Sequence, residues 1–396
     1  MSEWKTCLLG QLGEITSSKR IFQREYVESG IPFYRTKEIK ELANQESVSS
    51  ELFISRERYE EIKGKFGVPK IGDILVTAIG TVGEIYVVEN KEEFYFKDGN
   101  VLWLKNFEDV DPYFLRYLLS SLINDLKGLS SGSTYKALPI AKLKSYKVPL
   151  PPIAEQRRIA AILDKADAIR RKRKQAIQYT EELLRSAFLD MFGDPVTNPR
   201  NWEIVKLGSL IVGKPNNGIF KKNHEYDGGT PVVWVKELFG GHTIDFSESR
   251  TLSPTENEVE KYGLKKGDIL FCRSSLKLGG IGFSNVFDGM DFSALFECHV
   301  IRISPDQQKI NSIFLNYLLR LPGLRQQIIS KSNTVTMSTI GQGEIKQIKI
   351  YLPPKELQDQ FERFLRKTIA SQKKIEALKL DALFNSLLQR AFKGEL

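Results

Sequence analysis

The sequence predicts an α+β protein made of two similar modules of mixed helices and strands, each followed by a long helix. Three observations carry this prediction: two long stretches with apolar residues at helical spacing, strand-forming clusters ahead of each, and a repeat of about half the chain. We expect a first module over 1–150, a long helix over 151–192, a second module over 193–352 and a second long helix over 353–396.

The first long helix is predicted by the stretch 151–192. Its opening Pro151-Pro152 is tolerated in a first helical turn, and Gly193 followed by Pro195 is a common stop. Between these limits there is no proline or glycine, and apolar residues recur at helical spacing from Ile159 to Phe192. About 40 residues at about 1.5 Å each make a rod of about 60 Å. A second helix is therefore expected to share its apolar stripe.

That second helix is predicted by the stretch 353–396. The opening Leu352-Pro353-Pro354 repeats Leu150-Pro151-Pro152, and apolar residues recur at helical spacing from Phe361 to Phe392 before Gly394. Two unrelated amphipathic helices with similar caps would be the alternative. The similarity continues outside the helices, however, which favours duplication.

The modules themselves repeat in the same order. The matching pairs are Trp4 and Trp202, Gly30-x-Pro32 and Gly229-x-Pro231, Gly72-Asp73-Ile74-Leu75 and Gly267-Asp268-Ile269-Leu270, and Phe114-Leu115 and Phe314-Leu315. Strand signals cover 73–77, 84–88 and 101–104 in the first module and 232–235, 268–271 and 299–303 in the second. Shorter helices are expected over 111–126 and 311–329. Long polar segments over 126–139, 213–229 and 330–343 are candidates for binding.

Composition narrows the class of partner. A formal charge of +9 favours a polyanion, although moderately basic proteins are common. The basic run at 170–174 is either a solvated helix face or a phosphate-facing or partner-facing patch. No apolar run is long enough for a membrane span and no secretion signal is visible, so a cytoplasmic protein with no membrane partner is expected. Cys7, Cys272 and Cys298 are scattered, which disfavours a disulfide framework or a zinc ribbon.

The sequence offers little support for a catalytic activity of this chain. Asp111-Pro112-Tyr113 lacks the second proline of an adenine methyltransferase loop and is interpreted as a helix start. Neither of the two commonest glycine-rich nucleotide cradles occurs. Glu344-Ile345-Lys346 only loosely matches a nuclease pattern. The run Glu297-Cys298-His299 is expected on a strand, as buried structural residues rather than metal ligands.

These residues together carry a family pattern. The run Gly132-Ser133-Thr134-Tyr135-Lys136-Ala137-Leu138-Pro139, followed by Val148 to Pro152 and Glu155-Gln156, resembles the specificity subunit of type I restriction–modification systems, and so does the repeated Gly-Asp-Ile-Leu. The resemblance covers nearly the whole chain. The second copy departs from it, with Thr334-Val335-Thr336-Met337 at the equivalent loop and Leu357-Gln358 in place of Glu155-Gln156.

The resemblance implies a function for the whole architecture. Two target-recognition domains would be separated by two long antiparallel coiled-coil helices in a pseudo-twofold arrangement, each domain reading half of a bipartite double-stranded DNA site. Two modification subunits carrying S-adenosylmethionine would dock on the helices and methylate adenine. Restriction subunits using ATP and Mg²⁺ would join them. This chain itself would be non-catalytic and bind no cofactor or metal.

Candidate DNA contacts follow from side-chain chemistry in the predicted loops. Arg and Lys read guanine, Asn and Gln read adenine, and Lys, Ser and Thr hold phosphates. The candidates are Lys19, Arg20, Arg35, Lys37, Thr77, Ser133, Thr134, Tyr135 and Lys136 in the first module, and Asn216, Asn217, Lys221, Lys222, Trp234, Lys236, Arg273, Ser274, Ser275, Lys277, Asn333 and Thr334 in the second. The alternatives are a non-enzymatic scaffold that binds protein and, with less support, a stand-alone DNA modification enzyme.

Overall fold

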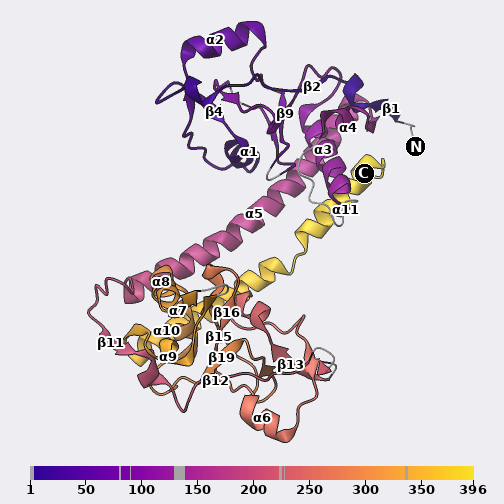
Figure 1. Ribbon diagram of the computed structural model, residues 1–396. Coiled ribbons are helices and arrows are strands. Elements are labelled where there is room, and N and C mark those ends of the chain that lie inside the picture. The colour runs from indigo at the N-terminus through magenta and orange to yellow at the C-terminus, as the bar shows by residue number, and fades with distance from the viewer. Residues whose placement is uncertain are drawn as a thin grey trace. The chain divides into compact units, whose positions relative to one another are not determined.

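The computed structural model describes residues 4–79, 82–89, 91–128, 139–222, 225–226, 228–334 and 338–396 (Figure 1). The chain divides into two compact units. Unit 1 comprises residues 1–175 and 378–396, and unit 2 comprises residues 176–377. Both units mix strands and helices, which confirms the predicted α+β class. None of the helices in the described part of the chain is long and apolar enough to cross a bilayer.

Unit 1 is built on a four-stranded antiparallel sheet in the order β2 (Glu14–Ser17), β9 (Val101–Lys105), β6 (Ile74–Thr77), β7 (Ile85–Val87). Both faces of this sheet are buried, because successive side chains of a strand point to opposite faces. Ile74 and Val76 pack in a cluster with Phe114 of helix α3 (Pro112–Gly128), whereas Leu75 packs in another with Ile39 of helix α1 (Thr36–Ala43).

A smaller sheet completes unit 1 and matters for the site. Its order is β3 (Tyr26–Val27), β5 (Phe53–Ile54), β4 (Ile31–Tyr34), β8 (Tyr95–Phe96), and β4 and β8 run parallel. A strand pair of β1 (Lys5–Leu8) and β10 (Lys147–Leu150) and the helices α2 (Arg56–Lys65) and α4 (Ile140–Lys144) make up the rest of the module.

Unit 2 repeats this plan, as the sequence duplication predicts. Its main sheet runs β12 (Asn216–Asn217), β19 (Val300–Ile303), β15 (Ile269–Cys272), β17 (Ser284–Val286). The smaller sheet runs β14 (Thr251–Leu252), β13 (Thr230–Val233), β18 (Leu295–Phe296), with β13 and β18 again parallel. The outer pair is β11 (Glu203–Lys206) with β22 (Lys349–Leu352).

Unit 2 contains further elements besides these sheets. A third small sheet runs β16 (Ser274–Ser275), β21 (Ser338–Thr339), β20 (Asn333–Thr334), and the helices include α6 (Glu256–Tyr262) and α9 (Gln342–Lys346). The single helix expected over 311–329 is two helices, α7 (Ser312–Arg320) and α8 (Pro322–Ser330). The division follows from Pro322, which forces Leu321 into an extended conformation (ψ 146°) and then starts α8.

The first long helix forms as predicted. Helix α5 (Ile153–Phe192) is 40 residues long and continuous. Its first part belongs to unit 1, where Ile159 and Leu163 join the core, and its last part belongs to unit 2, where Phe188 and Phe192 do the same. No residue between 168 and 183 is buried, so α5 is anchored by its two ends.

The second long helical stretch is divided into α10 (Lys355–Glu376) and α11 (Leu380–Phe392). Lys379, just before α11, has a left-handed backbone (φ 43°), which ends the helical path. A straight helix would place Phe384 about 100° around the axis from Leu365. Because both side chains are buried in different cores, the break allows each helix to turn its apolar face to its own unit.

The two helices pair with opposite ends of α5. In unit 1, Phe384 and Leu388 of α11 share a cluster with Ile159 of α5, and Phe392 stacks edge-on against Phe114 at 5.5 Å. In unit 2, Phe361 of α10 contacts Phe188 of α5 at 5.1 Å between ring centroids. The start of α5 therefore packs with the last helix and its end with the preceding one, which is an antiparallel arrangement.

One buried glutamine fixes the start of each long helix. In unit 1 the Gln156 amide nitrogen donates to the carbonyls of Pro151 (2.9 Å) and Asp109 (3.0 Å), and its oxygen accepts from the Asp111 N–H (2.8 Å). In unit 2 Gln358 donates to the Pro353 carbonyl (2.8 Å) and accepts from the Asn311 N–H (2.8 Å). This glutamine clamp ties the long helix to the start of α3 or α7, and it occurs in both copies.

Candidate nucleic-acid interface

Several of the predicted contact residues that the structure describes gather at one edge of each small sheet. In unit 1, Arg35 follows β4 and Asp98 follows the parallel strand β8. Because parallel strands end at the same edge, the segments after them lie together, and the Lys97 N–H donates to the Tyr34 carbonyl (2.9 Å). We call this the strand-end edge of unit 1. It contains Lys19, Arg20, Arg35, Lys37 and Asp98.

The basic residues of this edge already have partners within the protein. Arg35 donates to both Glu38 (2.7 Å) and Glu51 (2.9 Å), and Lys37 pairs with the same Glu51 at 3.3 Å. Hydrogen bonds to these carboxylates raise the pKa of Arg35 above its already high ordinary value. Arg35 therefore positions the start of α1 as well as offering a cation, and a base would have to compete with Glu51 for it.

Lys19 and Arg20 reach the edge from the segment after β2. The Lys19 N–H donates to the Tyr95 hydroxyl (2.7 Å), and its ammonium lies over the Phe66 ring at 5.1 Å from the centroid. Arg20 is 68% exposed and pairs with Asp98 at 2.8 Å. Both residues present a positive charge at the surface. Exchanging the Arg20–Asp98 ion pair for a phosphate contact would cost little free energy.

Thr77 is a correction to the predicted site. It ends β6, its side chain is fully buried, and its hydroxyl accepts a hydrogen bond from the Glu84 N–H (3.0 Å). Its side chain therefore closes a turn and has no exposed surface that could contact DNA. The candidates Ser133, Thr134, Tyr135 and Lys136 lie outside the described residues.

Unit 2 has the equivalent strand-end edge. Trp234 and Lys236 follow β13, and Glu297, Cys298 and His299 follow the parallel strand β18. Trp234 occupies the same helix-capping position as Arg35. In both copies the backbone N–H of this residue donates to a buried glutamate three residues on, Glu38 at 2.8 Å and Glu237 at 2.9 Å. The local backbone is thus the same in both units, whereas the side chain at this position differs.

Arg273 joins the edge of unit 2 from the end of β15. Its N–H donates to the His299 carbonyl (2.8 Å), and its guanidinium donates to the Cys298 carbonyl (3.3 Å). Arg273 and Lys277 are exposed, and Ser274 and Ser275 form β16 between them. The Ser275 hydroxyl donates to the Lys277 carbonyl (2.7 Å), so this serine is used in holding the turn.

The other candidates of unit 2 are partly engaged. Asn216 accepts from Arg302 (3.0 Å) and Asn217 accepts from Gln342 (3.2 Å). Lys221 pairs with Glu258 at 2.8 Å, which raises the pKa of the lysine, and the Lys222 N–H donates to Glu225 (2.6 Å). Asn333 and Thr334 form β20, but their side chains lie outside what the structure describes.

Sequence reasoning missed several residues at the same edge. Asp98, Arg250 and His299 all lie there, with the Arg250 guanidinium 4.9 Å from the centroid of the Trp234 ring and the tilted Tyr226 ring 5.0 Å from it. A usable signal existed for two of them. Asp98 and His299 lie shortly after β8 and β18, which match between the copies, so aligning those strands would have pointed to both.

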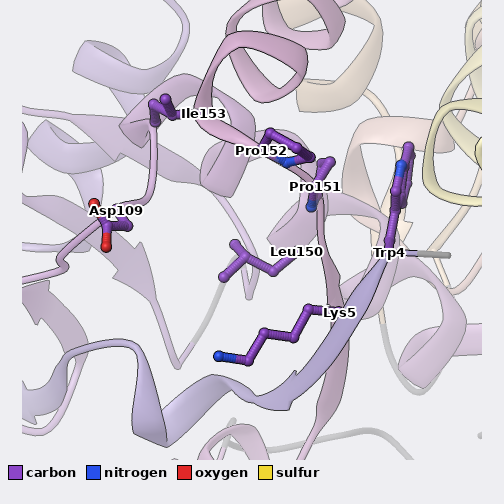
Figure 2. A pocket seen from close by; sticks show the side chains of 7 residues that line it. All are labelled: Trp4, Lys5, Asp109, Leu150, Pro151, Pro152 and Ile153. Atoms are coloured by element: carbon purple, nitrogen blue, oxygen red, sulfur yellow. The ribbon is translucent and has the colours of Figure 1, made fainter. Parts of the chain in front are cut away.

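A pocket in unit 1 lies apart from these residues. It has a volume of ≈ 450 Å³ and is lined by Trp4 and Lys5 around β1, Asp109, and the run from Leu150 to Ile153 that leads into α5 (Figure 2). None of the predicted DNA contacts lines it. The pocket shares Asp109 and Pro151 with the glutamine clamp, so it belongs to the joint between module and helix.

The fold and the site together define a class of protein. Two copies of a mixed α/β unit each present basic side chains at a strand-end edge. This is the arrangement of a DNA-reading protein with two recognition domains.

The chain belongs to the family of type I restriction–modification DNA specificity domains, whose profile matches residues 1–179 and again residues 199–383. It therefore carries two DNA specificity domains and is a non-catalytic DNA-recognition component of the type I restriction–modification kind.

Curated relatives and solved structures agree with this assignment. A relative from Haemophilus influenzae is 34% identical over 166 residues, a match that covers 42% of this chain and 40% of the relative. The MjaIX specificity subunit of Methanocaldococcus jannaschii is 25% identical over 422 residues, covering 100% of this chain and 94% of the relative. The crystal structure of an S subunit from M. genitalium has the same fold, with a TM-score of 0.55, 16% identity, and coverage of 98% of this chain and 96% of that one.

Proposed function

We propose that this chain reads a bipartite double-stranded DNA site, with each unit recognising one half through its strand-end edge. The observation that carries the proposal is the repetition of this edge. The same parallel strand pair, followed by a capped helical turn and basic residues, occurs once in each unit with different side chains at matching positions. Two units with the same backbone but different contact residues are expected to recognise two half-sites of different sequence.

The partners are also part of the proposal. Two modification subunits carrying S-adenosylmethionine would bind this chain and methylate adenine, and restriction subunits using ATP and Mg²⁺ would join them. The family assignment supports this, and so does one solved structure of the same fold (TM-score 0.50, 19% identity), which concerns complex assembly of the type I restriction–modification system. The middle of α5, where no residue from 168 to 183 is buried, offers surface for such docking.

The function is tested by co-expressing the chain with its modification subunit and mapping methyladenine across the genome. We expect methylation at one asymmetric motif with two specified parts and an unspecified spacer. Methylation without any motif, or none with a demonstrably active modification subunit, would contradict the proposal.

A binding experiment separates DNA recognition from a protein-binding scaffold. The complex with the modification subunit is titrated with duplex DNA at increasing salt, and affinity should fall steeply because phosphate contacts release counterions. Arg20→Ala should weaken binding and make it less sensitive to salt. Lys206→Ala provides the matched control, since Lys206 is exposed on the outer β11–β22 pair. Equal behaviour of the two variants would favour the scaffold.

A further inference from the structure

The turn between β18 and β19 in unit 2 brings three potential metal ligands together. The Val300 N–H donates to the Glu297 carbonyl (3.0 Å), which closes a turn with Cys298 and His299 at its centre. The Glu297 carboxylate, the Cys298 thiol and the His299 imidazole consequently place one ligand atom each within 4.8 Å of one another. The expectation of a strand with buried structural side chains was wrong for Cys298 and His299, because the turn leaves both partly exposed.

Glu297 is not fully accounted for by the fold. The residue is 2% exposed. Its Oε2 accepts from the His299 N–H (2.9 Å) and lies 2.8 Å from His299 Nδ1, but its Oε1 is buried and has no hydrogen-bond partner among the described residues. A buried carboxylate oxygen without a partner carries a desolvation cost that a bound cation would offset.

The spacing of the donors fits a tetrahedral ion. With zinc–sulfur bonds of about 2.3 Å and zinc–nitrogen bonds of about 2.0–2.1 Å, sulfur and nitrogen on one zinc lie about 3.6 Å apart. Cys298 Sγ and His299 Nδ1 lie 3.6 Å apart in the structure. Oxygen and nitrogen ligands on one zinc lie about 3.4 Å apart, so the 2.8 Å separation of Glu297 and His299 would widen by about half an ångström, within the reach of side-chain rotation.

We propose that Glu297, Cys298 and His299 form a binding site for one divalent transition-metal ion, with Zn²⁺ as the ion that suits this set of oxygen, sulfur and nitrogen donors. The thiol gives up its proton to solvent on binding, and the imidazole binds through Nδ1 with its proton on Nε2. Carboxylate and thiolate together balance the charge of the ion. Three protein ligands leave a fourth position for water.

The site is specific to unit 2 and lies beside a predicted DNA contact. The turn of unit 1 that follows the equivalent strand contains Lys97, Asp98, Gly99 and Asn100, without cysteine or histidine. The backbone carbonyls of Cys298 and His299 hold Arg273 through its guanidinium (3.3 Å) and its N–H (2.8 Å). Resting on the proposed function, metal binding would stiffen the turn that orients Arg273 and would affect only the half-site read by unit 2.

Metal binding is tested on the purified full chain without DNA, so that its outcome does not depend on DNA recognition. After removal of metal with a chelator, Co²⁺ is titrated in. We expect one equivalent to produce thiolate-to-cobalt charge-transfer absorption that one equivalent of Zn²⁺ removes. Cys298→Ser should abolish the charge-transfer band, and His299→Ala should weaken Zn²⁺ binding at least tenfold. Cys7→Ser should change neither, because the Cys7 thiol donates to the Val148 carbonyl in unit 1.

A second measurement needs no variant. Zn²⁺ should slow alkylation of Cys298 in the wild-type chain at least tenfold, read by peptide mass spectrometry, while Cys7 reacts at an unchanged rate. Cys272 is fully buried with a pKa raised to about 11 and should stay unmodified with or without metal. Unchanged Cys298 alkylation in Zn²⁺, or wild-type Zn²⁺ affinity in Cys298→Ser, would overturn the proposal.

Discussion

At the scale of single residues, matching positions in the two units have acquired different tasks. Arg35 and Trp234 cap equivalent helical turns through the same backbone hydrogen bond, yet one carries a cation held by two carboxylates and the other an aromatic ring covered by Arg250 and Tyr226. The backbone position is inherited from the duplication, and the side chain is free to differ. A prediction for either residue therefore has to separate its role in capping the helical turn from its role in DNA recognition.

Arg35→Ala should destabilise unit 1 in a pH-dependent way. Burial raises the pKa of Glu38, but the hydrogen bonds from Arg35 outweigh it and hold this pKa below its ordinary 4.5. A lowered folded-state pKa contributes stability that is present above pH 4.5 and is lost as pH falls through the folded value. Urea unfolding at pH 7 should show a loss of roughly 1–3 kcal/mol, moderated because Arg35 is partly solvated.

The difference in unfolding free energy between wild type and Arg35→Ala should become smaller toward pH 4, because a protonated Glu38 no longer forms an ion pair with Arg35. Lys37→Ala serves as the control, since Lys37 is 54% exposed and pairs with the exposed Glu51. An Arg35→Ala deficit of the same size at both pH values would show that Glu38 is not the group involved.

Arg273→Ala should relax sequence choice in one half-site only. Its guanidinium is exposed and bonded to a single backbone carbonyl at 3.3 Å, so it is freer than Arg35 to meet a base edge. Loss of a base contact costs roughly 1–3 kcal/mol at that position. Methyladenine mapping should show one degenerate position and an intact second half-site. Uniform weakening on all sequences would instead assign Arg273 to a phosphate.

Gln156→Ala should loosen the joint between module and long helix. The substitution leaves the Asp111 N–H and two carbonyls without their partner at a buried site, at about 1–3 kcal/mol for each group that water cannot reach. Gln178→Ala on the exposed middle of α5 is the matched control, because its amide donates to the exposed Glu182 one turn away. Hydrogen exchange around 109–111 should accelerate in the first variant and not in the second.

At the scale of elements, we propose that the length of α5 sets the distance between the two half-sites. It is continuous for 40 residues, and its two ends lie in different cores. The returning helices α10 and α11 are separated by the short link 377–379, which coincides with the boundary between the units. Adding residues to α5 at the unit boundary and to the link 377–379 would leave both cores unaltered.

Inserting seven helical residues after Gln175 and seven after Ala377 should lengthen the DNA spacer. Seven residues add about 10 Å of helix, which is about three base pairs at about 3.4 Å each. Both half-sites should stay unchanged, because the inserted segments lie at the unit boundaries. Methylation mapping that found the original spacer would reject the idea that helix length sets the distance.

At the scale of the whole molecule, the chain is a duplicated unit in which the second copy returns to complete the first. Residues 378–396 belong to unit 1, and their Phe384 and Leu388 fill a core made otherwise from the first half of the chain. Each unit thus combines a module with one end of α5 and one returning helix. We therefore predict that a module can be exchanged for another, provided that these helical contacts are kept.

Replacing residues 4–149 with the equivalent module of a relative that recognises another motif should change one half-site and retain the other. The recipient keeps α5, α10 and α11, so the graft has to preserve the apolar surface that meets Phe384 and Phe392. Mapped methylation is again the measurement. A simultaneous change of both halves would contradict independent reading by the two units.

Sequence alone determined the class, the duplication and α5, because periodic apolar residues, prolines and repeated motifs are local signals that lie along the chain. It also pointed to Arg35, Lys37, Lys236 and Arg273 as polar residues near strand ends.

Tertiary structure decided which of these side chains have free surface. Thr77 is buried, Arg35 is held by carboxylates, and the helix break before α11 separates a helix packed in unit 2 from one packed in unit 1. The physical reason is that burial, ion pairing and the direction of a side chain depend on neighbours distant in sequence, which no local pattern records.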